Sequence, residues 1–216
     1  MTDATIQSLN GLRDFSTIKW YIIPLLAIIC LIYAKEINKA REHRDWNPVF
    51  AALTVFGLDF FNETWNGWVL AITGRSAVWT APGDTAFRVT VGWNIEIIFM
   101  FLIAGFIYYY MLSKNKDKKF LKINEKWWVA LILTGVCVAV ECILNYGGQL
   151  IWEYALWNRT WAGIWTLFIF GYFIFFAGAA TIISFKKTKS KLIMLGVIYA
   201  VPIIMNIISL IVGWVY

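Results

Sequence analysis

Residues 48–73 read PVFAALTVFGLDFFNETWNGWVLAIT, an apolar stretch that carries acidic and amide side chains near its middle. A transmembrane helix needs about 20 mainly apolar residues. The stretch is therefore long enough to span a bilayer. An acid inside a span persists mainly where it faces a partner or a cavity within the protein. These two features together predict a membrane helix that contributes to a polar site.

Five other apolar stretches accompany this one in the 216-residue chain. The spans that we predict lie at about 16–34, 48–73, 93–112, 127–149, 161–185 and 192–214. Hydrophobic residues make up 60% of the chain and charged residues only 15%, whereas soluble domains carry roughly 25% charged residues. No linker or internal repeat divides the chain. The sequence therefore predicts one all-α domain, a polytopic transmembrane helical bundle of about six spans.

The basic residues set the predicted orientation. A net charge of +6 is compatible with nucleic-acid binding, but the positions of the basic residues argue against that partner. They gather in three clusters, at 35–44, 114–122 and 186–191, and each cluster lies between two predicted spans. Such loops face the cytoplasm and contact anionic lipid headgroups. We therefore expect both termini on the non-cytoplasmic side, membrane lipids as partners and no nucleic acid.

The remaining segments are predicted to lie near the outer membrane surface. Residues 74–92 are expected to form an exposed loop or a short interfacial helix, and residues 150–159 an interfacial element. The first 14 residues are polar and include two acids, so the first span is expected to remain as a signal anchor. The location predicted is an integral, multi-pass position in a prokaryotic plasma membrane or an endomembrane.

Acidic and amide side chains recur at one depth of the predicted bundle. Asp59 lies one helical turn below Glu63, since positions four apart share a helix face. At a rise of 1.5 Å per residue, Glu63 and Glu141 lie roughly 22 and 21 Å from the cytoplasmic ends of their spans. Glu96 and Asn206 reach similar heights. The sequence thus predicts a polar layer in the outer half of the bilayer, with Asp59 near the midplane.

The acids of this layer are the candidate catalytic residues. These are Asp59, Glu63, Glu96 and Glu141. The candidate substrate-binding residues are Asn62, Trp65, Asn66, Trp68, Trp93, Asn94, Asn145, Trp152, Glu153 and Asn206. Amides within spans can also serve only as hydrogen-bonding groups between helices. The acids are harder to explain that way, because no Lys, Arg or His lies within a span. They must be protonated, share protons or await a cationic ligand.

Several site chemistries are excluded by the residues present. The only histidine, His43, lies in a basic loop, which excludes a haem ligand pair, a histidine-based di-iron site and a Ser-His-Asp triad. The GxSxG and HExxH motifs are absent. We predict no metal and no cofactor. Carboxylate chemistry remains, as general acid–base catalysis, a hard cation held by oxygens, or an organic cation bound with aromatic help.

Two of the predicted spans carry a resemblance to a known family. The residues concerned are Pro48, Asp59, Asn62, Glu63 and Trp65, followed by Trp93 and Glu96 at the head of the next span. They are similar in kind, though not in order, to residues of the integral-membrane terpene cyclases of fungal meroterpenoid pathways. The resemblance implies Glu63 or Asp59 as the acid and Glu141 or Glu96 as the base. It also implies a pocket shaped by Trp65, Trp68 and Trp93, in which aromatic faces stabilise a carbocation.

Three functions follow from the sequence as alternatives. The first is an intramembrane cyclase- or isomerase-type enzyme that acts on a hydrophobic terpenoid or lipid-like small molecule, in an aromatic-lined pocket open to the outer side. The second is a transporter or channel that binds a cation or small solute at the carboxylate layer. The third is a non-catalytic partner subunit. Residues 49–58 below Asp59 are apolar apart from Thr54 and Gly57, which favours a closed cup over a channel. No oligomeric state is predicted.

Overall fold

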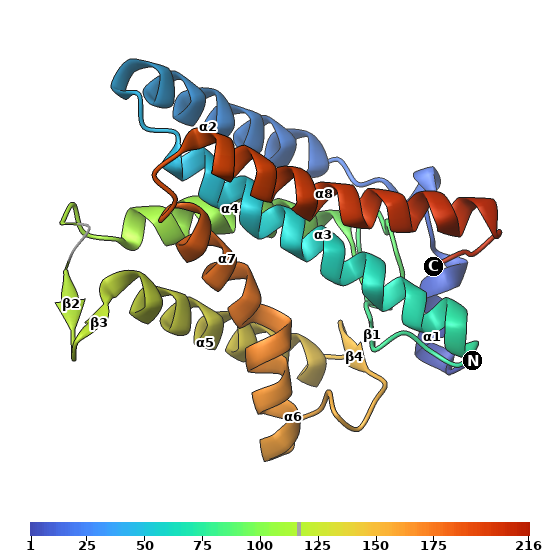
Figure 1. Ribbon diagram of the computed structural model, residues 1–216. Helices are drawn as coiled ribbons and strands as arrows, with labels where there is room; N and C mark the ends of the chain where they lie inside the picture. The colour runs from blue at the N-terminus through green and yellow to red at the C-terminus, as the bar shows by residue number, and fades with distance from the viewer. Residues whose placement is uncertain (116–117) are drawn as a thin grey trace.

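The computed structural model describes residues 1–115 and 118–216, and it shows a bundle of long helices with a few two-residue strands (Figure 1). Lys116, which belongs to the second basic cluster, lies outside the described residues. The long helices are α2 (Ile22–His43), α3 (Asn47–Thr73), α4 (Ile95–Met111), α5 (Glu125–Tyr146) and α8 (Thr188–Ile211). Between α5 and α8, α6 (Trp161–Thr166), the π-helix η2 (Leu167–Phe173) and α7 (Ile174–Ile182) follow one another without interruption.

The short elements lie between these helices. They are α1 (Asp3–Asn10), the 3₁₀-helix η1 (Phe15–Thr17) and the strands β1 (Trp79–Thr80), β2 (Lys119–Phe120), β3 (Ile123–Asn124) and β4 (Ile151–Trp152). The pairs β1–β4 and β2–β3 are antiparallel.

Three helical segments are long and apolar enough to cross a membrane. They cover Glu125–Tyr146, Trp161–Ile182 and Thr188–Ile211, and α4 is a shorter apolar helix. Each of the six apolar stretches predicted from the sequence overlaps a helix, although the ends differ by several residues. The largest difference is in α2, which continues to His43. Part of the first basic cluster therefore lies on the last turns of this helix instead of in a loop.

Helix α3 is the centre of the bundle. It packs against α2, α4, α7 and α8. The contact with α4 is close because Gly105 faces the α3 backbone, and a Cβ atom at this position would lie 2.4 Å from the Ala51 carbonyl oxygen. The apolar core beside it includes Val55 of α3, Phe101 of α4 and Phe175 of α7. The polar side chains of α3 are therefore held among packed helices.

Both termini lie at one end of the bundle. The same end holds α1, β1 and β4, whereas the β2–β3 hairpin and the α2–α3 and α7–α8 turns lie at the other end (Figure 1). The three basic clusters fall in or beside the elements of that second end. The charged and the terminal ends of the bundle are thus opposite.

The terminal end is covered by a structure that we call the cap, which comprises residues 1–17, 74–94 and 150–157. Its segments are joined by backbone hydrogen bonds, such as the 2.8 Å bond from the amide of Arg13 to the carbonyl of Arg88. Strand β1 pairs with β4, with Trp79 opposite Trp152. The Arg88 guanidinium lies inside the cap and donates to the carbonyls of Ala81 at 3.0 Å and Gly83 at 2.8 Å. These bonds hold the loop in a fixed shape.

The prediction of an exposed loop or interfacial helix at 74–92 is wrong. Ala77, Ala86 and Val91 of this segment are fully buried, and Ala81 is nearly so. The segment contains no helix and folds back onto the end of the bundle. The reason is that its small apolar residues pack against α3 and α1, while Arg88 satisfies its free carbonyls. Sequence polarity alone does not reveal such packing.

Candidate active site

A cavity of about 150 Å³ lies beneath the cap, between α3, α4, α5 and η2. Its lining includes three acids and one amide of the predicted polar layer, namely Asp59, Asn62, Glu63 and Glu141. The other walls are mostly apolar or aromatic and include Trp79, Phe101, Val140, Trp157, Leu167, Tyr172 and Phe175. No basic residue is among the described residues that line it. The cavity therefore combines several negative or protonated groups with an apolar interior.

Each of these three acids accepts a hydrogen bond from a tryptophan indole. The pairs are Trp93 with Asp59 at 2.9 Å, Trp79 with Glu63 at 2.8 Å, and Trp152 with Glu141 at 2.6 Å. All three tryptophans belong to the cap. An indole N–H can only donate, so it fixes one carboxyl oxygen without supplying a proton acceptor or a positive charge. The cap therefore orients the acids but does not neutralise them.

Helix α3 and the cap position Glu63 together. The side chain of Asn66, one turn beyond Asn62, accepts from the amide of Val78 at 2.8 Å and donates to the carbonyl of Trp79 at 2.8 Å. This clamp brings the Trp79 indole over Glu63. Gly92 approaches from the other side, where a Cβ atom would lie 2.7 Å from Glu63 Oε2. Only glycine fits at this point.

The far wall of the cavity comes from the segment before α6 and from the π-helix. Trp157 stacks on Trp79, with ring centroids 5.4 Å apart. Its indole N–H is buried and has no partner among the described residues. Tyr172 lies on η2 and lines the cavity together with Glu141. A π-helix is rare and frequently occurs at functional sites, because its wider turn shifts side-chain positions.

The cavity reaches the flank of the bundle between α4 and α5. Three of its lining residues are also exposed on the surface: Met100 at 52%, Val136 at 52% and Val140 at 37%. Toward the terminal end, Trp79, Leu150 and Trp157 close it. The pocket expected to open at the terminal end is therefore covered there by the cap, and its opening is lateral.

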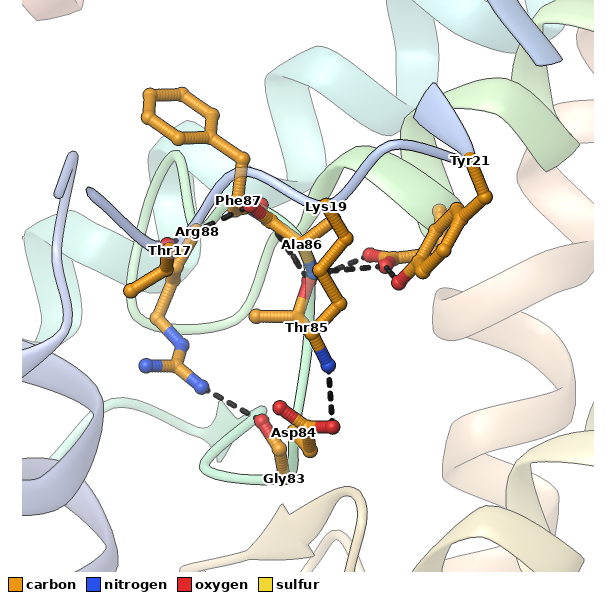
Figure 2. A network of polar contacts seen from close by, with 10 residues as sticks. Thr17, Lys19, Tyr21, Gly83, Asp84, Thr85, Ala86, Phe87 and Arg88 are labelled. Carbon is orange, nitrogen blue, oxygen red and sulfur yellow. Dashed lines mark hydrogen bonds and ion pairs between the residues drawn. The ribbon is translucent and has the colours of Figure 1, made fainter. Parts of the chain in front are cut away.

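Glu96, the fourth predicted acid, lies outside the cavity. It is on the first turn of α4, where its carboxylate accepts from the amide of Ala86 at 2.9 Å and from the hydroxyls of Tyr21 and Thr85. Figure 2 shows the surrounding network, which joins residues 17–21 to residues 83–88 of the cap. Glu96 therefore ties the cap to α4 instead of meeting the other acids.

The same network includes an exposed ion pair between Lys19 and Asp84 (Figure 2). The hydrogen bond from Lys19 holds the pKa of Asp84 below its usual range. This pair links the segment before α2 to the cap.

Most of the other predicted binding residues hold the fold together. Asn94 caps the N-terminus of α4 by accepting from the amide of Ile97 at 2.9 Å, and Asn145 donates to the carbonyl of Leu150 at 3.0 Å. Glu153 accepts from the hydroxyl of Thr2 at 2.7 Å.

Two more of these residues join α3 to α8. Trp68 donates to Ser209 at 2.8 Å, and Asn206 donates to Thr64 at 2.9 Å. Trp65 lies beside the Trp79 ring and is 37% exposed. These three residues do not line the cavity.

Comparisons with known proteins identify the chain at the level of its family. The sequence profile of an uncharacterized membrane protein family matches residues 2–211. The chain belongs to this uncharacterized membrane protein family. An uncharacterized protein of Archaeoglobus fulgidus is 41% identical over 175 residues, which cover 81% of this chain and 80% of that protein. No solved structure matches the chain.

Membership of this membrane protein family corrects one expectation. The resemblance to the integral-membrane terpene cyclases is wrong, because the profile that matches nearly the whole chain is that of a different family. The shared residues were acids, asparagines and tryptophans of two spans. Those residue types recur wherever a membrane helix carries a polar face, so they do not identify a family. The family and the apolar helices show a multi-pass integral membrane protein.

The cavity is also lined by residues that the sequence did not single out, among them Trp79, Trp157 and Tyr172. Trp79 lies in the loop that was expected to be exposed, and Trp157 in the segment that was expected to be interfacial. Tyr172 lies in an apolar span, and a single tyrosine there is a weak signal. The heavy tryptophan content is a usable clue, because an indole N–H needs an acceptor when it is buried.

Among the described residues, no group of three or more His, Cys, Asp or Glu side chains is placed to hold one metal ion. Asp59 Oδ1 accepts no hydrogen bond from the part of the chain that the structure describes, while Oδ2 is held by Trp93. A carboxyl that lines a cavity is a group that can give or take a proton there.

Proposed function

We propose that this membrane protein is an intramembrane enzyme that carries out carboxylate acid–base chemistry on a lipid-soluble substrate. One observation carries the proposal: Asp59, Glu63 and Glu141 line a single cavity that opens laterally between α4 and α5. A soluble substrate would need a path from water, whereas a substrate dissolved in the bilayer reaches a lateral opening directly. The reaction belongs to the class in which a proton is added to or removed from a hydrophobic molecule.

The proposed membrane arrangement has six spans, with both termini on the non-cytoplasmic side. Helix α3 has 27 residues and α2 has 22. At 1.5 Å per residue these lengths are about 40 and 33 Å, enough to cross a hydrocarbon core of about 30 Å. The basic clusters lie at the end opposite the termini, which supports a cytoplasmic position for that end. The cap then lies at the outer surface.

Charge balance explains why the acids can act. Burying a carboxylate is costly unless its charge is compensated. The cavity lining contains three carboxyls and no basic residue among the described residues, so protons or a cation must offset part of the charge. In the resting enzyme we assign this role to bound protons. One protonated acid then serves as the proton donor and a neighbouring carboxylate as the acceptor, as in other sites with paired carboxyls.

The volume of the cavity also limits the size of the reacting group. A volume of about 150 Å³ is comparable to an apolar cavity that binds benzene. The reacting part of the substrate is therefore compact, and a longer chain would extend through the opening beside Met100 and Val140. Asn62 lines the cavity, and Trp157 offers a buried N–H that has no partner among the described residues. Both suit a substrate with an oxygen atom that accepts hydrogen bonds.

The experiment compares purified wild-type protein with Glu63→Gln and Asp59→Asn. Each protein is incubated in detergent with the total lipid extract of the source organism, and the lipids are profiled by mass spectrometry. We expect the wild-type protein to deplete one lipid-soluble compound and form one product, and each variant to lose at least 100-fold in rate, the lower range for removing a general acid or base. Glu42→Gln, an exposed acid-to-amide change on α2, should keep full activity. Identical profiles for wild type and Glu63→Gln would refute the enzyme.

Cation binding is the second candidate, and the absence of a basic residue among the described lining residues favours it. In that case the acids hold a cation taken from solution. Proteoliposomes containing the wild-type protein would then take up protons or Na⁺, and Glu63→Gln would abolish uptake. The core residues between the cavity and the basic end include Tyr108, Val129 and Phe176, whose buried apolar packing argues against a polar route to that end. That packing makes the enzyme the better supported function.

A further inference from the structure

A second hollow lies on another side of the bundle, where α2 and α8 flank α3. It is a groove of about 730 Å³. Its lining residues are Tyr33, Trp46, Val49, Phe50, Leu53, Phe56, Leu102, Leu192, Leu195, Gly196 and Tyr199. Phe56 stacks on Trp93, the indole partner of Asp59, with ring centroids 5.8 Å apart. The groove does not share a lining residue with the carboxyl cavity.

The walls of this groove are apolar because its two tyrosine hydroxyls are hydrogen-bonded to backbone carbonyls. The Tyr33 hydroxyl donates to the carbonyl of Leu102 at 2.9 Å, and the Tyr199 hydroxyl donates to the carbonyl of Leu53 at 2.9 Å. The ring faces of both tyrosines are left as walls. At Gly196 the groove is open, since a Cβ atom there would have no heavy atom within 4 Å. Such a surface suits a hydrocarbon chain.

One end of the groove is positively charged. Leu192 and Trp46 line that end, next to the start of α8 and the start of α3. Lys187 and Lys189 are exposed there. Lys191 lies 5.5 Å from the centre of the Phe50 ring. The N-termini of α3 and α8 add partial positive charge at the same end. An anionic group is therefore favoured where the apolar groove ends.

We propose that this groove binds one phospholipid with an anionic headgroup. One acyl chain lies along Phe50, Leu195 and Tyr199, and the phosphate lies at the basic end beside Lys187 and Lys189. The two halves of the surface fit the two halves of such a lipid, which is why a phospholipid is favoured over a wholly apolar molecule. In the six-span arrangement the headgroup is in the cytoplasmic leaflet, where anionic lipids are concentrated. The proposal is independent of the function of the carboxyl cavity.

The test uses delipidated full-length protein and native mass spectrometry, with added phosphatidylglycerol or phosphatidylcholine. Wild-type protein should retain one phosphatidylglycerol molecule and bind phosphatidylcholine at least tenfold more weakly. Gly196→Phe fills the groove and should reduce phosphatidylglycerol retention at least tenfold. Gly135→Phe is the matched control, because Gly135 on α5 also has open space around it but does not line the groove. It should bind like the wild type.

The role of the basic residues is tested separately with the double variant Lys187→Gln/Lys189→Gln. Both side chains are exposed, so this variant is expected to fold even if Gly196→Phe does not. It should retain phosphatidylglycerol no better than phosphatidylcholine. Two results would overturn the proposal. The first is that the wild-type protein retains both lipids equally, and the second is that the double variant prefers phosphatidylglycerol as strongly as the wild type does. Either result would mean that bulk lipid covers the groove without selection.

Discussion

The indole N–H of Trp79 donates a 2.8 Å hydrogen bond to Glu63 and thereby joins the cap to the central helix α3. Both residues are buried. Trp79 also stacks on Trp157, so a single side chain of the cap contacts two walls of the cavity. Glu63 therefore has two roles in the structure. It is a candidate acid of the site and a fastening point for the cap that closes the site.

Replacing Trp79 by Phe should destabilise the protein by about 1–3 kcal/mol, because Glu63 Oε1 would lose its indole donor while remaining buried. Trp157→Phe is the matched control, since Trp157 is equally buried but its N–H has no partner among the described residues. It should cost less. Thermal unfolding in detergent measures both. Equal losses would show that the hydrogen bond to Glu63 is unimportant and that only ring packing matters.

Gly105→Ala should lower stability by about 2 kcal/mol or more, in the range of overpacked cores, since the added Cβ would meet the backbone of Ala51 and Ala52 at 2.4 Å. Helices α3 and α4 would have to separate. In Gly135→Ala, the added Cβ atom would have no neighbouring heavy atom within 4 Å. This variant should leave stability unchanged or raise it by about 0.5–1 kcal/mol, because alanine favours a helix more than glycine does. Unfolding midpoints of the two variants provide the comparison. A stable Gly105→Ala protein would contradict the close α3–α4 contact.

Val140→Trp should block the lateral opening and lower turnover of the lipid-soluble substrate at least tenfold. Val140 lines the cavity and is partly exposed at its mouth. Ile143→Trp is the control on the same helix, because Ile143 is 70% exposed and does not line the cavity. Turnover by the wild type, measured as in the lipid-profiling experiment, is the reference. If both tryptophan variants were fully active, the substrate would have to enter by another route.

Cysteine labelling tests the proposed orientation. In a background without Cys30, Cys137 and Cys142, a membrane-impermeant maleimide added outside should label Arg159→Cys. It should not label Lys119→Cys until the membrane is permeabilised. Both positions are exposed in the structure, so differences in reactivity report the side of the membrane. Labelling of Lys119→Cys in intact cells would reverse or break the six-span arrangement.

The Lys19–Asp84 pair predicts a pH dependence of cap stability. The hydrogen bond from Lys19 lowers the pKa of folded Asp84, so the pair stabilises the cap above the ordinary aspartate pKa of about 3.9. That contribution disappears as the pH falls through the lowered pKa of the folded state. The difference in unfolding temperature between wild type and Asp84→Asn should therefore be small but present at neutral pH, and absent in strong acid. Lys19→Gln should remove the same pH dependence. A difference that is independent of pH would contradict this account.

The amino-acid sequence was enough to predict a helical bundle and the acidic residues that are candidates for its site. Long apolar stretches need lipid or burial, so their positions predicted helices throughout the chain. The spacing of Asp59 and Glu63 placed both on one helix face. The structure adds that Asp59, Glu63 and Glu141 line one cavity, while Glu96 lies elsewhere. Periodicity describes one helix at a time, and it does not show how separate helices rotate toward one another.

How the cavity is covered, and where it reaches the surface, became visible in the folded protein alone. The loop at 74–92 looks polar in sequence, yet it is buried because Arg88 satisfies its carbonyls and Asn66 clamps its backbone. The indole partners of Asp59 and Glu63 come from the chain between α3 and α4, and the indole partner of Glu141 comes from β4, beyond the end of α5. Such contacts depend on long-range packing, which leaves no periodic pattern in the residues. The same packing leaves Val140 both lining the cavity and partly exposed on the flank of the bundle, and the proposal of a substrate from the bilayer rests on this position.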